Sequence, residues 1–266
     1  MTSPKAKQEK RVIEKQIEIA ALVEAVWKAL TQSEELKRWF PLEAQVTPGE
    51  GGKITLSWGP GFEGTSQIEA WDENQRLRLI DSSSGQPVAV EWTIESRGGK
   101  TLVRVVQSSF ASGADWEGEF YDSTNYGWGF MLLNLRHYLE RHFRQPRLVA
   151  WPRRKVEMTR EAIYEKLSGR QGIFADGVRG NLQAGSRYSL VAATGETWKG
   201  RVEFVVPPRG FCVAVESLND ALAWLTIEGS GPEHEAQIWF STYGLPQEQV
   251  TKLEAQWNDE LERILR

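Results

Sequence analysis

Cysteine is almost absent from this 266-residue chain, because Cys212 is the only one. A single cysteine excludes an intrachain disulfide and a thiolate metal site built within one chain. Disulfides belong to oxidising compartments, so their exclusion favours a cytoplasmic protein. Cys212 lies in the apolar run 211–215 and is predicted to be a small buried hydrophobe rather than a nucleophile.

Long hydrophobic runs and an excess of basic charge are missing as well. No apolar run approaches the ~18 residues that span a bilayer, and the polar start of the chain is not that of a signal peptide. The net charge of −4, without a basic stripe, gives no general attraction to nucleic acid or to an anionic membrane. We therefore expect neither a membrane span nor a nucleic-acid partner.

Residues with the spacing of metal or phosphate sites are also lacking. The chain has three histidines, and two of them, His137 and His142, are five residues apart, so they do not share a helix face as ligands at i and i+4 do. No histidine–carboxylate cluster has zinc spacing, and no glycine-rich phosphate loop or nucleophile elbow is present. We predict no metal, no cofactor and no complete catalytic site, which favours a non-enzymatic protein without excluding an enzyme.

What the chain has in abundance is tryptophan, with twelve residues. Large aromatic rings bury much apolar area, but tryptophan also lines ligand cavities because its ring is rigid and its N–H can orient a ligand.

The periodicity of the first half predicts a strand, two short helices, an antiparallel meander and a long helix. Ile13, Ile17 and Ile19 alternate with polar residues as in a half-buried strand, and residues 22–30 then change to helical spacing. Ser33 can cap a second short helix that ends before Pro41. Short polar turns separate five further predicted strands, which must be antiparallel because parallel neighbours need long crossovers: 54–58, 66–71, 77–80, 88–94 and 102–106.

The last predicted element of this half is a long helix that ends near residue 142. Its apolar stripe has spacings of four, three and four residues, and consists of Trp128, Leu132, Leu135 and Leu139. The segment that follows, 144–153, is rich in proline and arginine and is interpreted as a semi-rigid linker.

The same order of patterns then recurs in the second half. Segments 162–167, 185–190, 203–213 and 224–228 echo 25–30, 52–56, 69–79 and 92–95, and a final helical stripe recurs at Val250, Leu253, Trp257, Leu261 and Ile264. Several matches in one order predict a tandem duplication. The second copy is diverged, since glycine-rich residues 168–172 replace the second short helix and predict a loop or a single turn. We expect this copy to stabilise the first.

Three groups of residues in the first copy resemble a known family. They are 26–31 with 36–40 in the two short helices, 51–53 at the start of the meander, and 127–128 with 132–139 in the long helix. Together they resemble the bacterial branch of the START-like (SRPBCC, birch-pollen-allergen-like) superfamily related to the C-terminal domain of the heat-shock-protein-90 ATPase activator. The resemblance covers roughly residues 10–143, and 154–266 resembles the family more loosely.

The resemblance implies an α+β fold made of two tandem helix-grip domains, each a curved antiparallel sheet wrapped round a long C-terminal helix. The first START-like domain would span residues 1–143, the linker 144–153, and the second, diverged domain 154–266. The family fold leaves an apolar cavity between sheet and helix. Members bind lipids, polyketides or hormones, a few are cyclases or hydrolases, and one branch stimulates a chaperone.

Nine inward-facing residues of the first copy are predicted to bind a ligand: Trp39, Phe40, Leu56, Trp58, Ile68, Trp92, Val105, Trp128 and Leu132. Two interpretations stay open, since these side chains either fill the interior as a solid core or line a cavity. Polar strand residues could orient a ligand, and three fall within strands: Glu69, Glu91 and Gln107. The two carboxylates are expected to face solvent. Either one facing inward would have a raised pKa and could serve as an acid or base.

Three functions are compatible with these observations. The first is a non-enzymatic module that binds a hydrophobic or aromatic small molecule in the first copy. The second is a protein-interaction module of the chaperone-activator type, and the third is a cyclase-like or hydrolase-like enzyme acting on a cavity-bound substrate. We expect a monomer or a weak dimer.

Overall fold

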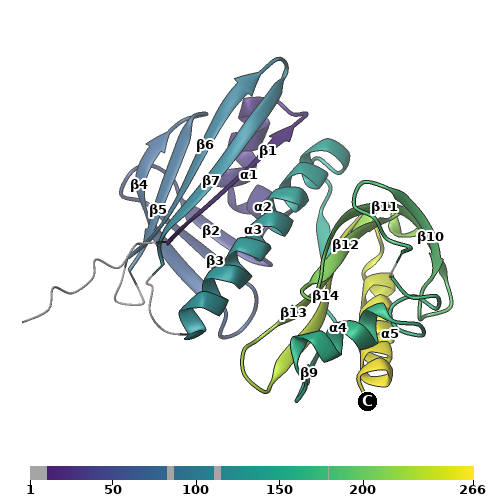
Figure 1. Ribbon diagram of the computed structural model, residues 1–266. Coiled ribbons are helices and arrows are strands. Elements are labelled where there is room, and N and C mark those ends of the chain that lie inside the picture. Colours follow the sequence, from purple (N-terminus) through teal and green to yellow (C-terminus); the bar gives the residue numbers. More distant parts are fainter. Residues whose placement is uncertain (1–10, 83–86, 111–114, 179) are drawn as a thin grey trace, which may run out of the picture. The chain divides into compact units, whose positions relative to one another are not determined.

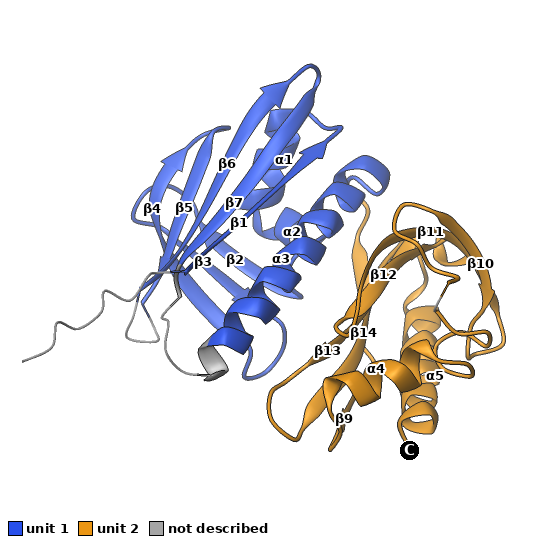
Figure 2. Cartoon of the chain, viewed as in Figure 1, with its two compact units in different colours: residues 1–144 blue, residues 145–266 orange. Residues whose placement is uncertain are grey.

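The computed structural model describes residues 11–82, 87–110, 115–178 and 180–266. The chain divides into two compact units, which cover residues 1–144 and 145–266 and are coloured separately in Figure 2. Each unit has its own sheet and its own long C-terminal helix, as the ribbon in Figure 1 shows. The α+β tandem fold predicted from the sequence is therefore confirmed. Within the described residues, no helix is long and apolar enough to cross a membrane.

The first unit begins with a strand and two short helices and ends with a helix of 27 residues. Its elements are β1 (Arg11–Ile19), α1 (Val23–Thr31), α2 (Ser33–Leu36), β2 (Glu43–Thr47), β3 (Lys53–Ser57), β4 (Glu63–Asp72), β5 (Arg76–Asp81), β6 (Val88–Arg97), β7 (Lys100–Phe110) and α3 (Asp115–Arg141). The sheet has the order β1-β7-β6-β5-β4-β3-β2, and every pair is antiparallel. This is the helix-grip arrangement.

The sequence patterns account for these elements. Gly59 and Gly61 form the β3–β4 turn, and Gly98 and Gly99 form the β6–β7 turn, all with the positive φ angles that glycine adopts without strain. Strand β2 was missed by the sequence analysis, although its buried Ala44 alternates with the exposed residues Glu43 and Gln45. Two alternations are too few to distinguish a short edge strand from a loop.

The second unit repeats this order with fewer elements in its first part. It contains β8 (Arg147–Ala150), β9 (Arg153–Val156), α4 (Arg160–Ser168), β10 (Arg187–Val191), β11 (Thr197–Val206), β12 (Gly210–Val215), the 3-10 turn η1 (Glu216–Leu218), β13 (Ala221–Glu228), β14 (His234–Tyr243) and α5 (Gln247–Leu265). Its sheet has the order β10-β11-β12-β13-β14-β8, and β9 also pairs with β14.

The segment that we interpreted as a linker is not one. Residues 147–150 and 153–156 form β8 and β9, which pair in succession with β14, as β1 pairs with β7 in the first unit. Pro152 divides the strand because it has no N–H to donate, although its carbonyl oxygen still accepts a bond of 3.0 Å from the Ile238 N–H. The proline and arginine content of this segment is typical of a linker, but here it belongs to an interrupted edge strand.

A shared irregularity supports the duplication. The ladder between β4 and β5 shifts register between Ile68 and Ala70, which leaves Glu69 unpaired in a bulge. The ladder between β11 and β12 shifts between Val202 and Phe204, which places Glu203 in the same situation. Glu69 and Glu203 are the residues that the sequence comparison aligned, so both copies keep the same β-bulge.

As predicted, the second copy has no helix corresponding to α2 among its described residues. Helix α4 ends at Ser168, and a loop follows in which Ile173, Phe174, Val178 and Leu182 are all buried. This loop fills the unit's interior with side chains where the first unit has α2 and β2.

Candidate ligand-binding site

Trp39 is held at the centre of the first unit by two hydrogen bonds. It follows α2 in a tight turn and is completely buried. Its indole N–H donates to the Ala29 carbonyl oxygen at the end of α1, with a distance of 2.8 Å. Its own carbonyl oxygen accepts a bond from the side-chain amide of Asn134 on α3. These bonds fix the short helices to the long one, and so fix the position of the ring.

Five aromatic residues form a continuous cluster around this ring, which we call the aromatic cluster: Trp39, Phe40, Trp58, Trp92 and Trp128. Phe40 stacks on Trp39 and on Trp128, with ring centroids 5.0 and 5.8 Å apart. Trp92 meets Trp39 and Trp128 edge to face at 6.1 and 5.2 Å, and Trp58 meets Phe40 at 5.3 Å. Such geometries are those that aromatic pairs favour.

The cluster is buried on one side and accessible on the other. Trp39, Trp92 and Trp128 are buried, whereas Phe40 and Trp58 are half-buried. The remaining predicted residues continue the same interior surface. Val105 lies directly opposite Trp92 in the sheet, and Leu132 follows Trp128 by one helical turn. Ile68 is buried on β4 and Leu56 half-buried on β3.

One polar side chain reaches the cluster from the sheet. Gln107 lies on β7, is largely buried, and accepts a hydrogen bond of 2.6 Å at Oε1 from the Trp128 indole N–H. Within the described part of the chain, no partner for the Gln107 side-chain N–H₂ group is found. Gln107 is not one of the nine residues predicted to bind a ligand, although its place in a strand made it a polar group that could orient a ligand.

A second polar group, on α3 beneath the cluster, had not been predicted from the sequence. Asn134 is completely buried, and its Oδ1 atom has no partner among the described residues. One turn further along α3, the Tyr138 hydroxyl donates to Glu35 on α2, and Glu35 forms an ion pair of 2.6 Å with Arg38. The polar residues of α3 therefore hold α2 in place, and α2 in turn positions the aromatic cluster.

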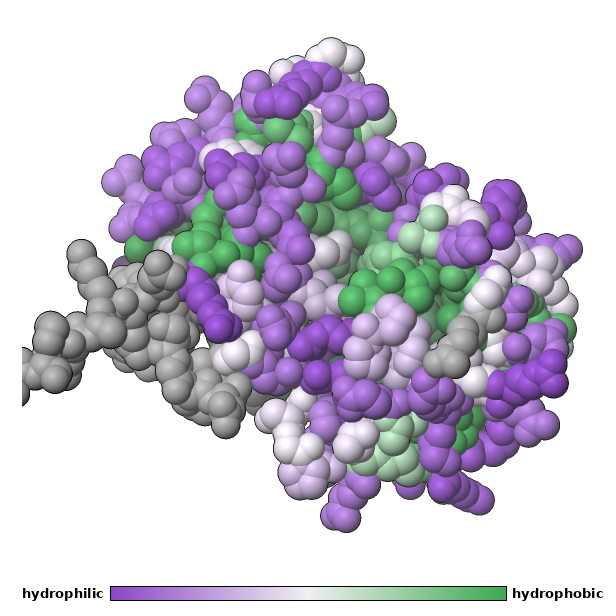
Figure 3. All heavy atoms as spheres, viewed as in Figure 1, coloured by the Kyte–Doolittle hydropathy of each residue, from purple (hydrophilic) through white to green (hydrophobic). Residues whose placement is uncertain are grey.

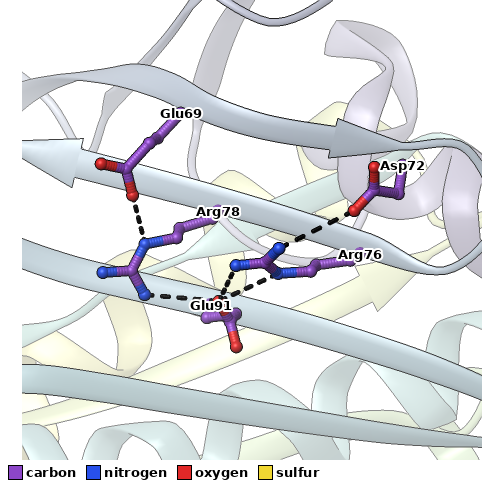
Figure 4. Close-up of polar contacts among 5 residues, drawn as sticks. All are labelled: Glu69, Asp72, Arg76, Arg78 and Glu91. Atoms are coloured by element: carbon purple, nitrogen blue, oxygen red, sulfur yellow. Dashed lines mark hydrogen bonds and ion pairs between the residues drawn. The ribbon is translucent and has the colours of Figure 1, made fainter.

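The strand carboxylates face away from the cluster, as expected. Figure 4 shows Glu69 and Glu91 paired with arginines of β5. Glu91 accepts bonds from Arg76 at 2.9 and 3.1 Å, and Arg78 lies between Glu91 and Glu69. The register places Glu91 beside Arg78, on the opposite side of β6 from Trp92.

The electrostatics of Glu91 oppose a role as a general acid. Burial alone would raise the pKa of Glu91, but the hydrogen bonds and positive charges of Arg76 and Arg78 outweigh it and lower that pKa below its ordinary value. A carboxylate that stays ionised and faces outward cannot protonate a molecule held at the cluster.

Two histidines at the end of the long helix, His137 and His142, lie closer together than their sequence spacing predicted. Their ring centroids are 5.0 Å apart, and both rings are buried. The sequence spacing did not predict this contact between His137, on α3, and His142, which directly follows the last helical residue Arg141.

Apolar side chains also reach the surface of the first unit. Figure 3 shows hydrophobic patches between hydrophilic side chains on the visible face. Phe62, in the turn after Trp58, is 62% exposed, and Phe120 on α3 is 50% exposed. The Phe62 carbonyl oxygen accepts a hydrogen bond of 3.0 Å from the backbone N–H of Trp58. This bond closes the turn that joins Phe62 to a residue of the aromatic cluster.

The corresponding interior of the second unit is closed. Phe174 packs between Trp198 and Phe211, with centroids 5.9 and 6.2 Å away, and Trp198 also contacts Trp257 at 5.1 Å. All four rings are buried. The loop that replaces α2 thus contributes Phe174 to a sealed core.

Residues 20–140 match the family model described as Activator of Hsp90 ATPase homolog 1-like protein. A comparison with curated proteins found no match.

Several solved structures are similar to parts or all of the chain. The Aha1 dimer from Colwellia psychrerythraea is 23% identical, covering 49% of this chain and 96% of its own, with a TM-score of 0.44. DynU16, a putative protein of the dynemicin biosynthetic locus, is 16% identical over 96% of both chains, with a TM-score of 0.44. The di-domain ARO/CYC protein BexL, from the BE-7585A biosynthetic pathway, is 13% identical over 95% of this chain and 99% of its own, with a TM-score of 0.45.

The family match covers most of the first unit and begins at the last residues before α1. It includes both short helices, the meander and α3 almost to its end, which are the elements that carried the resemblance in the sequence. Over residues 20–140, the first unit therefore has the sequence pattern of the Activator of Hsp90 ATPase homolog 1-like family, and the resemblance inferred from its motifs is confirmed.

Proposed function

We propose that the first unit binds a hydrophobic or aromatic small molecule at the accessible side of the aromatic cluster, without transforming it. The observation that carries this proposal is the graded burial of the cluster. Trp39 and Trp92 form a rigid, buried base, and Phe40 and Trp58 present ring surface that is only half-buried. Flat apolar ligands gain most from such pre-positioned rings, since little side-chain entropy is lost on binding.

Gln107 supplies the polar group that such a site needs for orientation. Its Oε1 atom is held by Trp128, which leaves its N–H₂ group to donate to a carbonyl or hydroxyl oxygen of the ligand. Ligand sites combine a mainly apolar wall with a few precisely positioned polar groups. The aromatic cluster and Gln107 together have this form. An enzymatic function has less support, because Glu69 and Glu91 face away from the cluster.

Native mass spectrometry of freshly purified protein tests the proposal by revealing a small molecule that co-purifies. A titration with 2-naphthol, a flat aromatic alcohol, then measures the site directly. Replacing Trp58 by Ala should weaken binding about tenfold, given what aromatic contacts contribute. The matched control is Trp151→Ala in the second unit, a half-buried tryptophan that meets Trp239 edge to face with ring centroids 4.9 Å apart, and this change should leave binding unchanged. Equal affinities for the two variants would contradict the proposal.

A protein-interaction function is the second candidate, and it is favoured by the family match and by the exposed rings of Phe62 and Phe120. Exposed aromatic side chains are common in protein interfaces. The test is the ATPase rate of a purified bacterial Hsp90 with and without this protein. A stimulation that Phe62→Ser abolishes, with 2-naphthol binding intact, would favour this function over small-molecule binding.

We further propose a cytoplasmic protein that is a monomer or weak dimer. The location is supported by the lone Cys212, which is buried and whose thiol pKa is raised by burial. Sedimentation velocity over a range of concentrations tests the oligomeric state, and a stable higher oligomer would contradict it.

A further inference from the structure

Both units have a groove in the same place, apart from the aromatic cluster. In the first unit a groove of about 580 Å³ lies between α1 and the β4–β5 turn. In the second a groove of about 470 Å³ lies between α4 and the β11–β12 turn. Aligning the repeats pairs the residues that line them: Glu24 with Glu161, Trp27 with Tyr164, Lys28 with Glu165, Thr31 with Ser168, and Trp71 with Val205.

The groove of the first unit contains an aromatic corner. Trp27 comes from α1 and Trp71 from the end of β4, and their ring centroids are 5.2 Å apart with planes at 77°. Trp27 is buried and Trp71 half-buried. The two rings meet edge to face, and the half-buried Trp71 leaves ring surface accessible in the groove, an electron-rich surface of the kind that attracts a cation.

Carboxylates flank this corner. Glu24 on α1 and Glu73 in the β4–β5 turn both line the groove and are exposed. The one basic side chain among the residues that line it is Lys28, one helical turn after Glu24. Among the described residues, none of these three side chains has an ion-pair partner. The lining therefore has an excess of negative charge beside two indole rings.

From this juxtaposition we propose that the groove between α1 and the β4–β5 turn binds an organic ammonium ion. The tryptophan rings would contact its alkyl groups and its charge together, and Glu24 and Glu73 would supply the counter-charge. A quaternary ammonium group suits such a site, because it is weakly hydrated and loses little on leaving water. This site is separate from the aromatic cluster, so the proposal of an ammonium site does not depend on the proposed function of the cluster.

The second unit shows which substitutions test the site. In the groove of the second unit, Val205 occupies the position of Trp71 and Glu165 the position of Lys28. Both side chains are therefore compatible with a groove of this kind. Trp71→Val removes one wall of the aromatic corner and should weaken cation binding about tenfold. Lys28→Glu replaces the only basic side chain of the lining by an acidic one and should tighten binding about fivefold.

Choline chloride is the probe, and 3,3-dimethylbutan-1-ol, its neutral carbon isostere, is the control. With the full chain labelled with ¹⁵N, we expect millimolar choline to shift two indole N–H signals, which Trp27→Phe and Trp71→Val identify by their disappearance. The neutral isostere should leave these signals in place. Equal shifts with both compounds, or unchanged choline affinity in Trp71→Val and Lys28→Glu, would overturn the proposal.

Two further measurements make the outcome decisive. Lys28→Glu changes an exposed side chain, so it tests the charge preference even if Trp71→Val proves poorly folded. Sedimentation with phosphatidylcholine vesicles then separates two sources of the same chemistry. Co-sedimentation that free choline competes away identifies a lipid headgroup, whereas choline binding without co-sedimentation identifies a soluble ammonium compound.

Discussion

The outer faces of the two sheets differ far more than their strand orders do. In the first unit, the face of β5 and β6 that is turned away from the aromatic cluster carries ion pairs among Arg76, Arg78 and Glu91. In the second unit, Cys212, Trp224 and Trp239 lie opposite one another on the corresponding face, and all three are buried. After a duplication, a sheet can therefore keep its strand order while the chemistry of its outer face is replaced, since only the inward residues define the core.

The interiors of the two units differ in how far their aromatic rings are buried. The aromatic cluster of the first unit includes the half-buried rings of Phe40 and Trp58, whereas Phe174, Trp198 and Trp257 of the second unit are sealed inside. The difference comes from one segment, because α2 with its following turn positions Phe40, and the loop after α4 inserts Phe174. This comparison favours the first unit as the one that binds a ligand.

The largest effect is expected when the units are expressed separately. Residues 145–266 alone should aggregate or bind the dye ANS more strongly than residues 1–144, because Cys212, Trp224 and Trp239 give the outer face of their sheet an apolar composition. Residues 1–144 are the matched control, since charged residues cover the outer face of β5 and β6. Size-exclusion chromatography and ANS fluorescence measure the difference, and a clean monomer of residues 145–266 would contradict the comparison.

The same experiment tests the prediction that the second copy stabilises the first. We expect residues 1–144 to unfold at a lower urea concentration than the first-unit transition of the full chain. An identical midpoint for the fragment and the full chain would refute that prediction.

The next largest effect is expected for truncating the interior rings. Phe174→Ala should lower the free energy of unfolding by about 3–5 kcal/mol, because it leaves a cavity in a sealed core. Phe40→Ala should cost less, since the Phe40 ring is already half-buried rather than buried. Urea unfolding followed by circular dichroism gives both values. A larger loss for Phe40→Ala would reverse the interpretation of which interior is sealed.

Conservative changes of two buried tryptophans compare their polar environments. Trp128→Phe should cost about 1–3 kcal/mol, since it leaves Gln107 Oε1 without its donor. Trp257→Phe should cost less, because the buried Trp257 N–H has no partner among the described residues. Urea unfolding of both variants under one set of conditions measures the two losses of unfolding free energy. Equal losses would show that the hydrogen bond to Gln107 contributes little to stability.

The smallest effect concerns the outer ion pairs and pH. Because the folded state lowers the pKa of Glu91, its contribution to stability is present above the ordinary glutamate pKa of about 4.3 and is lost as the pH falls below it. Glu91→Gln should therefore destabilise by about 1 kcal/mol at pH 7 and by less at pH 3. The half-exposed Gln237→Glu variant of the second unit serves as a control that adds rather than removes a strand carboxylate. A pH-independent effect of Glu91→Gln would exclude the ion pairs as its cause.

Local patterns predicted most of the architecture. The alternation in 13–19, the helical stripe from Trp128 to Leu139 and the glycine turns all have physical causes that act over a few residues. The alignment of Glu69 with Glu203 even matched residues that share a bulge. The prediction was wrong where Pro152 interrupts β8 and β9, because strand pairing with β14 is a long-range interaction that a proline-rich sequence does not reveal.

The tandem order, the diverged second copy and the inward aromatic residues were thus determined by the sequence itself, since hydrophobic period and turn chemistry are local properties. Only the tertiary structure decided which rings meet, that Gln107 reaches Trp128, that Glu91 is paired outward, and that Trp27 and Trp71 form a corner beside Glu24. These contacts join residues far apart in the chain, so they depend on strand register and helix packing, which no short window of sequence contains.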